Sequence, residues 1–339
     1  MSFSMTNLTI NMYASRMQRF QISSLQNRKQ RGVALIMVLG MVAIIAAWAS
    51  TATYEDLVSI RRISNLQDET RATMASESAY TLTRWYLKED AKLTTTDSLE
   101  EDWAVGMPPF PIDEGLISVV IEDSNRFYNL NDLVDNNGVV IPTHFAQLQN
   151  LFTLLSIDPD LVNKLVDWLD KDNIPYLAAG AEDTMYFERD YKVKNNRLDN
   201  WSELKLILGF DNDTITKLKA VATVAPSSAN ESANKGSSKV NINTASEEVM
   251  MSLFPNMTNA DAELFFKSRP YEDTNIVNQQ TWKTKGDVQR LSVESDTFMV
   301  RTHASFGRAN VREEFLLSRT GTTSPSIKLI WRERLGWQF

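Results

Sequence analysis

The chain of 339 residues contains no cysteine and only two histidines, His144 and His303. The lack of cysteine excludes disulfides and thiolate metal ligands, although it leaves the redox compartment open. The two histidines lie in different segments, and each is expected to be a packed or surface side chain instead of a catalytic base. The sequence also has no Gly-x-Ser-x-Gly motif and no Gly-x-x-x-x-Gly-Lys loop. We therefore expect a protein that is not an enzyme.

Acidic residues are absent before Glu55, and no charged side chain occurs from Val33 to Tyr54. A helix of these 22 residues spans a hydrocarbon core of about 30 Å, because each residue adds about 1.5 Å. Five basic residues precede the run, so the positive-inside rule places the N-terminus in the cytoplasm and everything after Glu55 on the other side. They are Arg16, Arg19, Arg28, Lys29 and Arg31.

Three interpretations of this apolar run remain open. A secretory signal peptide has a shorter apolar core, of about 7–15 residues, and a plain membrane anchor needs no processing site. The third interpretation rests on Gly32, which follows the basic leader and directly precedes the apolar helix. This arrangement resembles a prepilin-type signal, which is cleaved on the cytoplasmic side. Cleavage after Gly32 would make Val33 the new N-terminus and keep the apolar helix in the mature protein.

The chain is acidic outside its leader. Its net charge is −8, and removal of the five basic leader residues leaves −13 for the remainder. Because phosphate binding requires a clustered basic face, this balance disfavours nucleic acid as a partner. It is compatible with a metal ion that prefers oxygen ligands. About 280 residues follow the apolar run, which is enough for two domains with their own cores.

The helix is predicted to continue from Val33 to about residue 92, because residues 51–90 contain no glycine or proline. Such a helix would be about 90 Å long, with its first half in lipid and its second half on a soluble domain. This architecture is typical of pilins and pseudopilins. Apolar residues recur mostly at three- and four-residue steps and predict one apolar stripe: Leu57, Ile60, Ile63, Leu66, Met74, Ala79, Leu82 and Trp85.

Strands are predicted on both sides of a long helical region. The first is 116–131, which follows an expected polar linker at 93–114. The last three, separated by turn-forming stretches, are 297–306, 311–319 and 326–334. The segment 297–306 alternates well, with four residues expected on one face: Phe298, Val300, Thr302 and Ala304.

These elements predict an α+β fold, in which a pilin-like N-terminal helix lies on an antiparallel sheet and a large, mostly helical domain is inserted between strands. The expected parts are the leader at 1–32, the membrane part of the helix at 33–54, the pilin-type helix and first strand at 55–130, the inserted domain at 131–290, and the closing strands at 291–339.

The inserted region carries several short motifs in a fixed order. They are Asp-Trp-Leu-Asp-x-Asp at 167–172, Gly-Ala-Glu-Asp at 180–183, the Tyr191–Asn196 spacing, Ser-Glu-Leu at 202–204 leading to Gly209-Phe210, and Asn-Ile-Asn-Thr-Ala at 241–245. With the anchor and the strand order, the chain resembles the large minor pseudopilins of the type II secretion system, the K components, over nearly its whole length.

This resemblance implies an inner-membrane protein with its body in the periplasm, processed after Gly32 by prepilin peptidase and N-methylated on Val33. It implies a place at the pseudopilus tip with the minor pseudopilins I and J, in contact with secreted substrates or with the outer-membrane channel. Most pilin-like subunits carry Glu at the fifth mature position, where this chain has Met37. The alternative is a membrane-anchored periplasmic binding module that is not part of a filament.

The stretch 240–270 looks like a helix-hairpin-helix unit, a module that often contacts DNA. Thr244 and Glu247 predict a capping box at its first helix. The turn at 254–257, however, lacks the glycines that let backbone amides approach phosphates, and acidic residues surround it. Packing or partner binding is therefore expected here, and not DNA binding. The Ser- and Asn-rich stretch 226–238 before it is predicted to be a linker.

Four acidic residues occur within fourteen positions around a loop: Asp170, Asp172, Glu182 and Asp183. Carboxylates folded around one point can hold Ca²⁺, which accepts about 6–8 oxygen ligands. Zinc is not expected, since no cysteine or histidine is near. From spacing alone, solvated acids and helix caps remain an alternative, with Asp172 as a candidate cap. The resemblance implies calcium at these four residues, with Asn195 and Asn196 as additional ligands.

Overall fold

The computed structural model describes residues 27–225, 238–321 and 324–336. The first 26 residues of the predicted leader therefore lie outside the described residues, as do residues 226–237 of the Ser- and Asn-rich linker. The chain divides into two compact units between Gln67 and Asp68. The long helix α1, Asn27–Leu93, contributes to both. No glycine or proline occurs from residue 41 to its end, which explains why the helix continues for so long.

The described part of the first unit consists of the N-terminal portion of α1. Its most apolar 18-residue window has a mean hydropathy of 2.5, and none of that window is buried. The helix is therefore long and apolar enough to cross a membrane, and exposure of this window distinguishes it from the core helix of a soluble protein.

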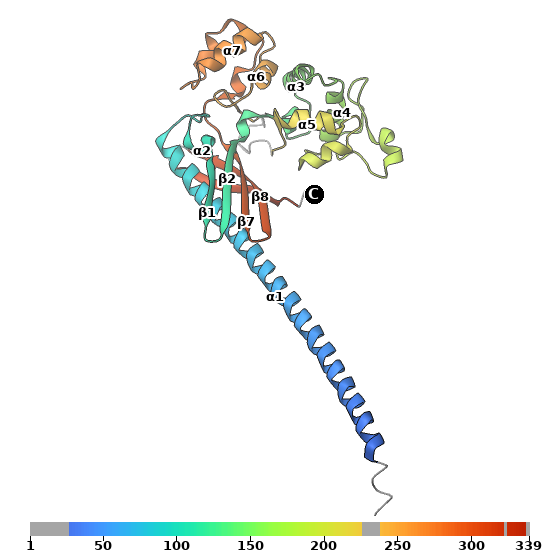
Figure 1. Cartoon of the computed structure of the whole chain (residues 1–339). Coiled ribbons are helices and arrows are strands. Elements are labelled where there is room, and N and C mark those ends of the chain that lie inside the picture. The colour runs from blue at the N-terminus through green and yellow to red at the C-terminus, as the bar shows by residue number, and fades with distance from the viewer. Residues whose placement is uncertain (1–26, 226–237, 322–323, 337–339) are drawn as a thin grey trace, which may run out of the picture. The chain divides into compact units, whose positions relative to one another are not determined.

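The second unit contains a five-stranded antiparallel sheet with strand order β1-β2-β7-β8-β9 (Figure 1). The strands are β1 Met107–Ile112, β2 Gly115–Asp123, β7 Thr297–Phe306, β8 Ala309–Thr320 and β9 Ser326–Arg334. The last part of α1 packs on this sheet through small residues such as Ala72, Ala75 and Ala79, which allow a close approach. Above them Tyr80 stacks on Phe315, with ring centroids 4.7 Å apart. This arrangement confirms the predicted pilin-like α+β fold.

The chain leaves the sheet at the end of β2 and returns at β7, and the region between is mostly helical (Figure 1). A single cluster of buried side chains runs through its main helices. The α-helices are α3 Pro142–Leu154, α4 Leu161–Leu169, α5 Asn212–Lys219, α6 Glu247–Leu253, α7 Asn259–Lys267 and α8 Asn275–Asn278; short 3₁₀ turns include η3 Asp183–Arg189, and the two-residue strands are β3 Tyr128–Asn129, β4 Ala222–Thr223, β5 Val240–Asn241 and β6 Leu291–Ser292.

The sheet differs from the sequence prediction at its first edge. The expected polar linker contains the short helix α2, Asp102–Val105, and the edge strand β1, whose three prolines are tolerated because it pairs on one side only. The predicted strand 116–131 ends early, at Asp123, because the carboxylate of Asp123 accepts a hydrogen bond from the Asn125 amide and starts a 3₁₀ turn. In contrast, the predicted alternation of β7 is confirmed, since Phe298, Val300, Thr302 and Ala304 are all buried.

The stripe predicted on α1 is not the face that packs on the sheet. Of its members, only Ala79 is buried against the sheet, whereas Met74, Leu82 and Trp85 are 66%, 49% and 58% exposed. The sheet instead covers a face of small residues together with Tyr80 and Leu87. The prediction was based mostly on large apolar side chains, whereas close packing of a helix on a sheet selects small ones.

The predicted capping box at the helix-hairpin-helix stretch is also wrong. Ser246, not Thr244, caps α6 by accepting the Val249 amide, and a capping box occurs at α7 between Thr258 and Asp261. The Thr244 hydroxyl instead donates to the fully buried carboxylate of Asp123. Ser295 and Asn241 donate to the same oxygen. This network joins the end of β2 to the residues at and just after β5 and to the residues just before β7.

Candidate metal centre

Helix α4 brings the first acidic residue to the edge of the core. Every one of its side chains except that of Lys164 is buried, including the polar Asn163 and Asp167. It ends at Asp170, whose backbone amide still donates to the Val166 carbonyl at 2.8 Å. The Asp170 side chain is only 4% exposed, so its carboxylate sits at the helix end inside the protein.

Three of the four predicted acids converge at this point. Asp170, Asp172 and Glu182 each place a carboxylate oxygen within 4.8 Å of the other two. Asp170 and Glu182 are buried, and Asp172 is exposed. The Asp172 carboxylate also accepts the Ile174 amide at 2.8 Å, but no helix begins there, so Asp172 is not the helix cap that the alternative interpretation expected. Three clustered carboxylates repel one another unless a cation or protons neutralise them.

Several oxygens at this centre lack hydrogen-bond partners among the described residues. These atoms are buried: Oδ1 of Asp170, both carboxylate oxygens of Glu182, and Oδ1 of Asn195. A buried polar atom without a partner costs about 1–3 kcal/mol, and more when it is charged. A bound cation would satisfy these oxygens together. The donor set contains only oxygen, which fits Ca²⁺ and does not fit zinc.

The electrostatics of the centre agree with this geometry. Burial raises the pKa of Asp170 to about 7, and the negative charges of Asp172 and Asp167 act in the same direction. Burial also raises the pKa of Glu182 to about 7, with further contributions from Asp167 and Asp170. Without a cation, these groups resist ionisation at neutral pH because their charges lie close together in a low-dielectric site.

Asp167 fixes the loop that returns Glu182 to the end of α4, and the sequence prediction missed this role. Its two carboxylate oxygens accept the backbone amides of Tyr176, at 2.7 Å, and Ala181. A Cβ atom on Gly180 would collide with Asp167 and Tyr176, so only glycine allows this close approach. Asp167 is fully buried and lies one helical turn from the ligand candidates.

Asp183 does not join the cluster of three carboxylates. Its Oδ1 accepts the Val193 amide at 3.0 Å, and its Oδ2 lies 3.4 Å from Lys192 Nζ. The adjacent residue, Glu182, points into the cluster instead. The structure thus separates two neighbouring acids that the sequence prediction had grouped.

The two predicted asparagine ligands also differ. Asn195 donates from Nδ2 to the Asp172 carbonyl at 2.8 Å, which leaves its buried Oδ1 as one of the oxygens without a partner. The Asn196 side-chain oxygen accepts the Arg197 amide at 2.8 Å. Asn195 therefore adjoins the centre through Asp172, whereas the side chain of Asn196 bonds to its own backbone neighbour.

The family model for "Type II secretion system (T2SS), protein K" matches residues 126–227, which include the whole of this centre. A protein K of Pseudomonas aeruginosa is 30% identical over 240 residues, covering 67% of this chain and 69% of that protein. A protein K of Pectobacterium carotovorum is 27% identical over 333 residues, covering 91% of this chain and 98% of that protein. The chain belongs to the type II secretion system protein K family. The family predicted from the sequence is thereby confirmed.

A solved structure has the same fold. It is the GspK-GspI-GspJ complex from enterotoxigenic Escherichia coli, in which one chain matches with a TM-score of 0.68. The match is 24% identical and covers 81% of this chain and 100% of the other. Together with the family, it places the chain among the minor pseudopilins, components of a protein transport system.

The predicted processing positions of this protein K lie in α1. Gly32 and Val33 are helical, and Val33 is 54% exposed. Met37, at the fifth position after the predicted cleavage, is 59% exposed on the same helix. Residues 1–26 of the predicted leader lie outside the described part of the chain, and residues 27–32 form the first turns of α1.

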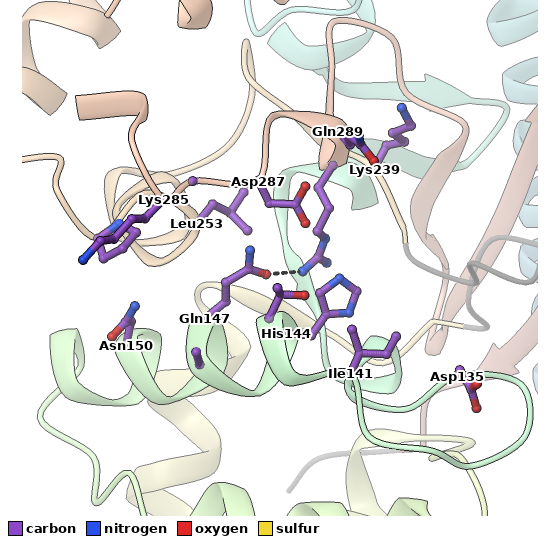
Figure 2. Close-up of a pocket in the computed structure, with 15 residues that line it drawn as sticks. Asp135, Ile141, His144, Gln147, Asn150, Lys239, Leu253, Lys285, Asp287 and Gln289 are labelled. Carbon is purple, nitrogen blue, oxygen red and sulfur yellow. Dashed lines mark hydrogen bonds between the residues drawn. The ribbon is translucent and has the colours of Figure 1, made fainter. Parts of the chain in front are cut away.

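The protein K insertion also contains a cleft of about 740 Å³ between α3 and residues 285–290. Figure 2 shows His144, Gln147 and Asp287 around it. Arg290 donates to Gln147 at 2.8 Å and pairs with buried Asp132 at 3.0 Å. Burial and the charge of Arg290 lower the pKa of His144 to about 4, so this imidazole stays neutral. The bonds of Arg290 to Gln147 and Asp132 tie together the two sides of the cleft.

Proposed function

We propose that this protein K caps the tip of the periplasmic pseudopilus with the minor pseudopilins I and J, promoting pseudopilus assembly and protein export without enzymatic activity. The observation that carries the proposal is a pilin-like helix and sheet bearing a large helical insertion, in a chain of the protein K family. The similar solved chain, found in complex with GspI and GspJ, supports these two partners.

The tip position is further supported by Met37. A Glu at this position is thought to pair with the N-terminal ammonium of the subunit above it in the filament, and an unpaired carboxylate at membrane depth costs about 2.5–3.5 kcal/mol. A tip subunit has no subunit above it. An apolar Met37 removes that cost, and the bulky insertion between β2 and β7 would clash with a subunit stacked on it.

The exposed apolar part of α1 is proposed to anchor the chain in the inner membrane, with the second unit in the periplasm. Prepilin peptidase would cleave after Gly32, and Val33 would be N-methylated. The tip would then reach either secreted substrates or the outer-membrane channel. The acidic body and the acidic, glycine-poor hairpin between α6 and α7 argue against a nucleic-acid partner.

Calcium is the proposed ligand of the cluster formed by Asp170, Asp172 and Glu182. The buried oxygens without partners support it, as does the oxygen-only donor set. Bound Ca²⁺ would neutralise the clustered carboxylates and hold the loop against the end of α4. Of the three further ligands predicted from the sequence, Asn195 is the one proposed to join the set, through its contact with Asp172, because the side chains of Asp183 and Asn196 are engaged elsewhere.

The tip proposal is tested by co-expressing the full chain with the I and J pseudopilins of the same organism. A ternary complex should co-purify, and gold label on a tag inserted in the helical domain should decorate only the ends of pseudopili. Label along the filament sides would contradict capping. A protein that never associates with I or J would favour the alternative, a membrane-anchored periplasmic binding module outside the filament.

A further inference from the structure

A second group of acidic side chains lies where α1 ends, next to the base of the insertion, from which Asn241 donates to the Asp97 carbonyl at 3.0 Å. Asp90, Asp97 and Glu101 each place a carboxylate oxygen within 4.8 Å of the other two. Asp90 is on the last turn of α1, and the other two follow it in the segment before α2. Asp97 is 2% exposed, so at least one of these charges lies inside the protein.

Among the residues that the structure describes, Arg319 is the cation that pairs with these acids. Arg319, on β8, pairs with Asp90 at 3.1 Å and with Oδ2 of Asp97, and Oδ2 of Asp97 also accepts the Ser295 amide at 2.7 Å. Glu101 accepts only neutral donors: the Thr94 hydroxyl, the Ser98 amide and, at 2.7 Å, the Trp103 indole N–H. The group therefore carries more negative charge than Arg319 neutralises.

One oxygen of this group has no partner. Oδ1 of Asp97 is buried and accepts no hydrogen bond from any residue that the structure describes. Asp97 also lines a cavity of about 260 Å³ whose walls include hydroxyl groups of Thr94, Thr95 and Ser295. A buried carboxylate oxygen without a donor is costly, and a metal cation held by the three carboxylates would satisfy it and neutralise their excess charge.

We propose that Asp90, Asp97 and Glu101 form a second cation site, for a calcium-sized divalent ion. Its ligands are oxygens, with no histidine or cysteine among them, so zinc is disfavoured. The carboxylates that would hold the ion also pair with Arg319 on β8 and accept the Ser295 amide before β7, so the site would tie the end of α1 to both segments. This site is separate from the centre at Asp170 and does not depend on the proposed function.

Terbium luminescence provides a selective test, because Tb³⁺ occupies calcium sites and emits when a nearby indole absorbs light. Trp103 contacts Glu101 directly. The full-length protein in detergent micelles is titrated with Tb³⁺ alone, and bound Tb³⁺ is counted by equilibrium dialysis. We expect a binding phase whose emission Trp103→Phe removes without removing the bound ion, and which Ca²⁺ displaces.

Glu101→Gln should weaken this phase about tenfold or more, because it removes one ligand charge. Asp90→Asn provides a second variant if Glu101→Gln alters folding, which circular dichroism would reveal. Glu294→Gln, an exposed acid on the wall of the same cavity, is the matched control and should leave binding unchanged. Unchanged emission and stoichiometry in both Glu101→Gln and Asp90→Asn would show an ion-pair network around Arg319 only, and would overturn the proposal.

Discussion

Glu182 is the residue on which the calcium proposal depends most, because both of its carboxylate oxygens are buried without a partner among the described residues. Glu182→Gln keeps the shape and removes the charge. We expect this variant to lose the calcium-dependent rise in melting temperature, which reflects about 2.7 kcal/mol when free calcium is a hundredfold above Kd. Mg²⁺ should raise the melting temperature of the wild type only slightly.

Calorimetry of the soluble region in calcium, magnesium and chelator measures these differences. In chelator, Glu182→Gln should be at least as stable as the wild type, since it removes one of the repelling buried charges. Asp213→Asn, an exposed acid on α5, is the control and should keep the full calcium response. Identical wild-type melting curves with and without chelator would exclude the calcium centre.

His144 predicts a pH dependence of stability. Its pKa falls from about 6.5 to about 4 on folding, so the unfolded chain binds the extra proton between these values. The free energy of unfolding therefore decreases as pH falls from 6.5 towards 4, by up to about 3 kcal/mol from this residue. His144→Gln should show a smaller loss than the wild type in urea titrations across that range. Parallel losses in the two proteins would contradict the assignment.

The candidate centre could be predicted from the sequence only where its residues are close along the chain. Asp170, Asp172 and Glu182 lie on one loop, so their spacing indicated a shared site. The roles of Asp167 and Asp183 depend on which backbone amides the folded loop presents, and spacing carries no such information. The group at Asp97 was missed because its partner Arg319 arrives from β8, more than two hundred residues later.

The exposed side of α1 is the element best suited to bind the partner pseudopilins. Met74, Leu82 and Trp85 are exposed there, opposite the small residues that face the sheet. Helix-on-helix packing would bury them. We expect Trp85→Glu to weaken the complex with I and J about tenfold or more without lowering the stability of protein K itself.

Leu264→Glu is the matched control for this change. Leu264 is a similarly exposed apolar residue, 68% accessible, but it lies on α7 in the insertion. Pull-down and analytical ultracentrifugation of the three proteins measure the effect of each variant. A complex that tolerates Trp85→Glu as well as it tolerates Leu264→Glu would exclude this face as the interface.

Elements with strong local patterns were predictable, and elements defined by their neighbours were not. The last three strands followed from alternation and turn chemistry, and α1 followed from its lack of breakers. Strand β1 was missed because three prolines in six residues disfavour a strand unless it lies at an edge. The buried face of α1 was missed because alanines give a weak hydrophobic signal, although they pack closest to the sheet.

At the scale of the whole molecule, the proposed position at the pseudopilus tip predicts how the Met37→Glu substitution should behave. Met37→Glu should still insert in the membrane, because the cost of about 2.5–3.5 kcal/mol is small against the rest of the apolar helix. It should, however, weaken preferential placement at the tip. Counting pseudopili and measuring secretion in cells that carry only this variant tests the effect, with Met37→Leu as the control. Initiation and secretion equal to wild type would contradict the argument from the missing neighbour.

The most direct test of the pseudopilin account is the mature N-terminus. Mass spectrometry of the protein from the membrane fraction should find a chain that begins at N-methylated Val33, and the unprocessed chain should accumulate when prepilin peptidase is absent or Gly32 is replaced by a bulky residue. A protein isolated from peptidase-containing cells that still begins at Met1, or that begins after residue 50, would contradict the account.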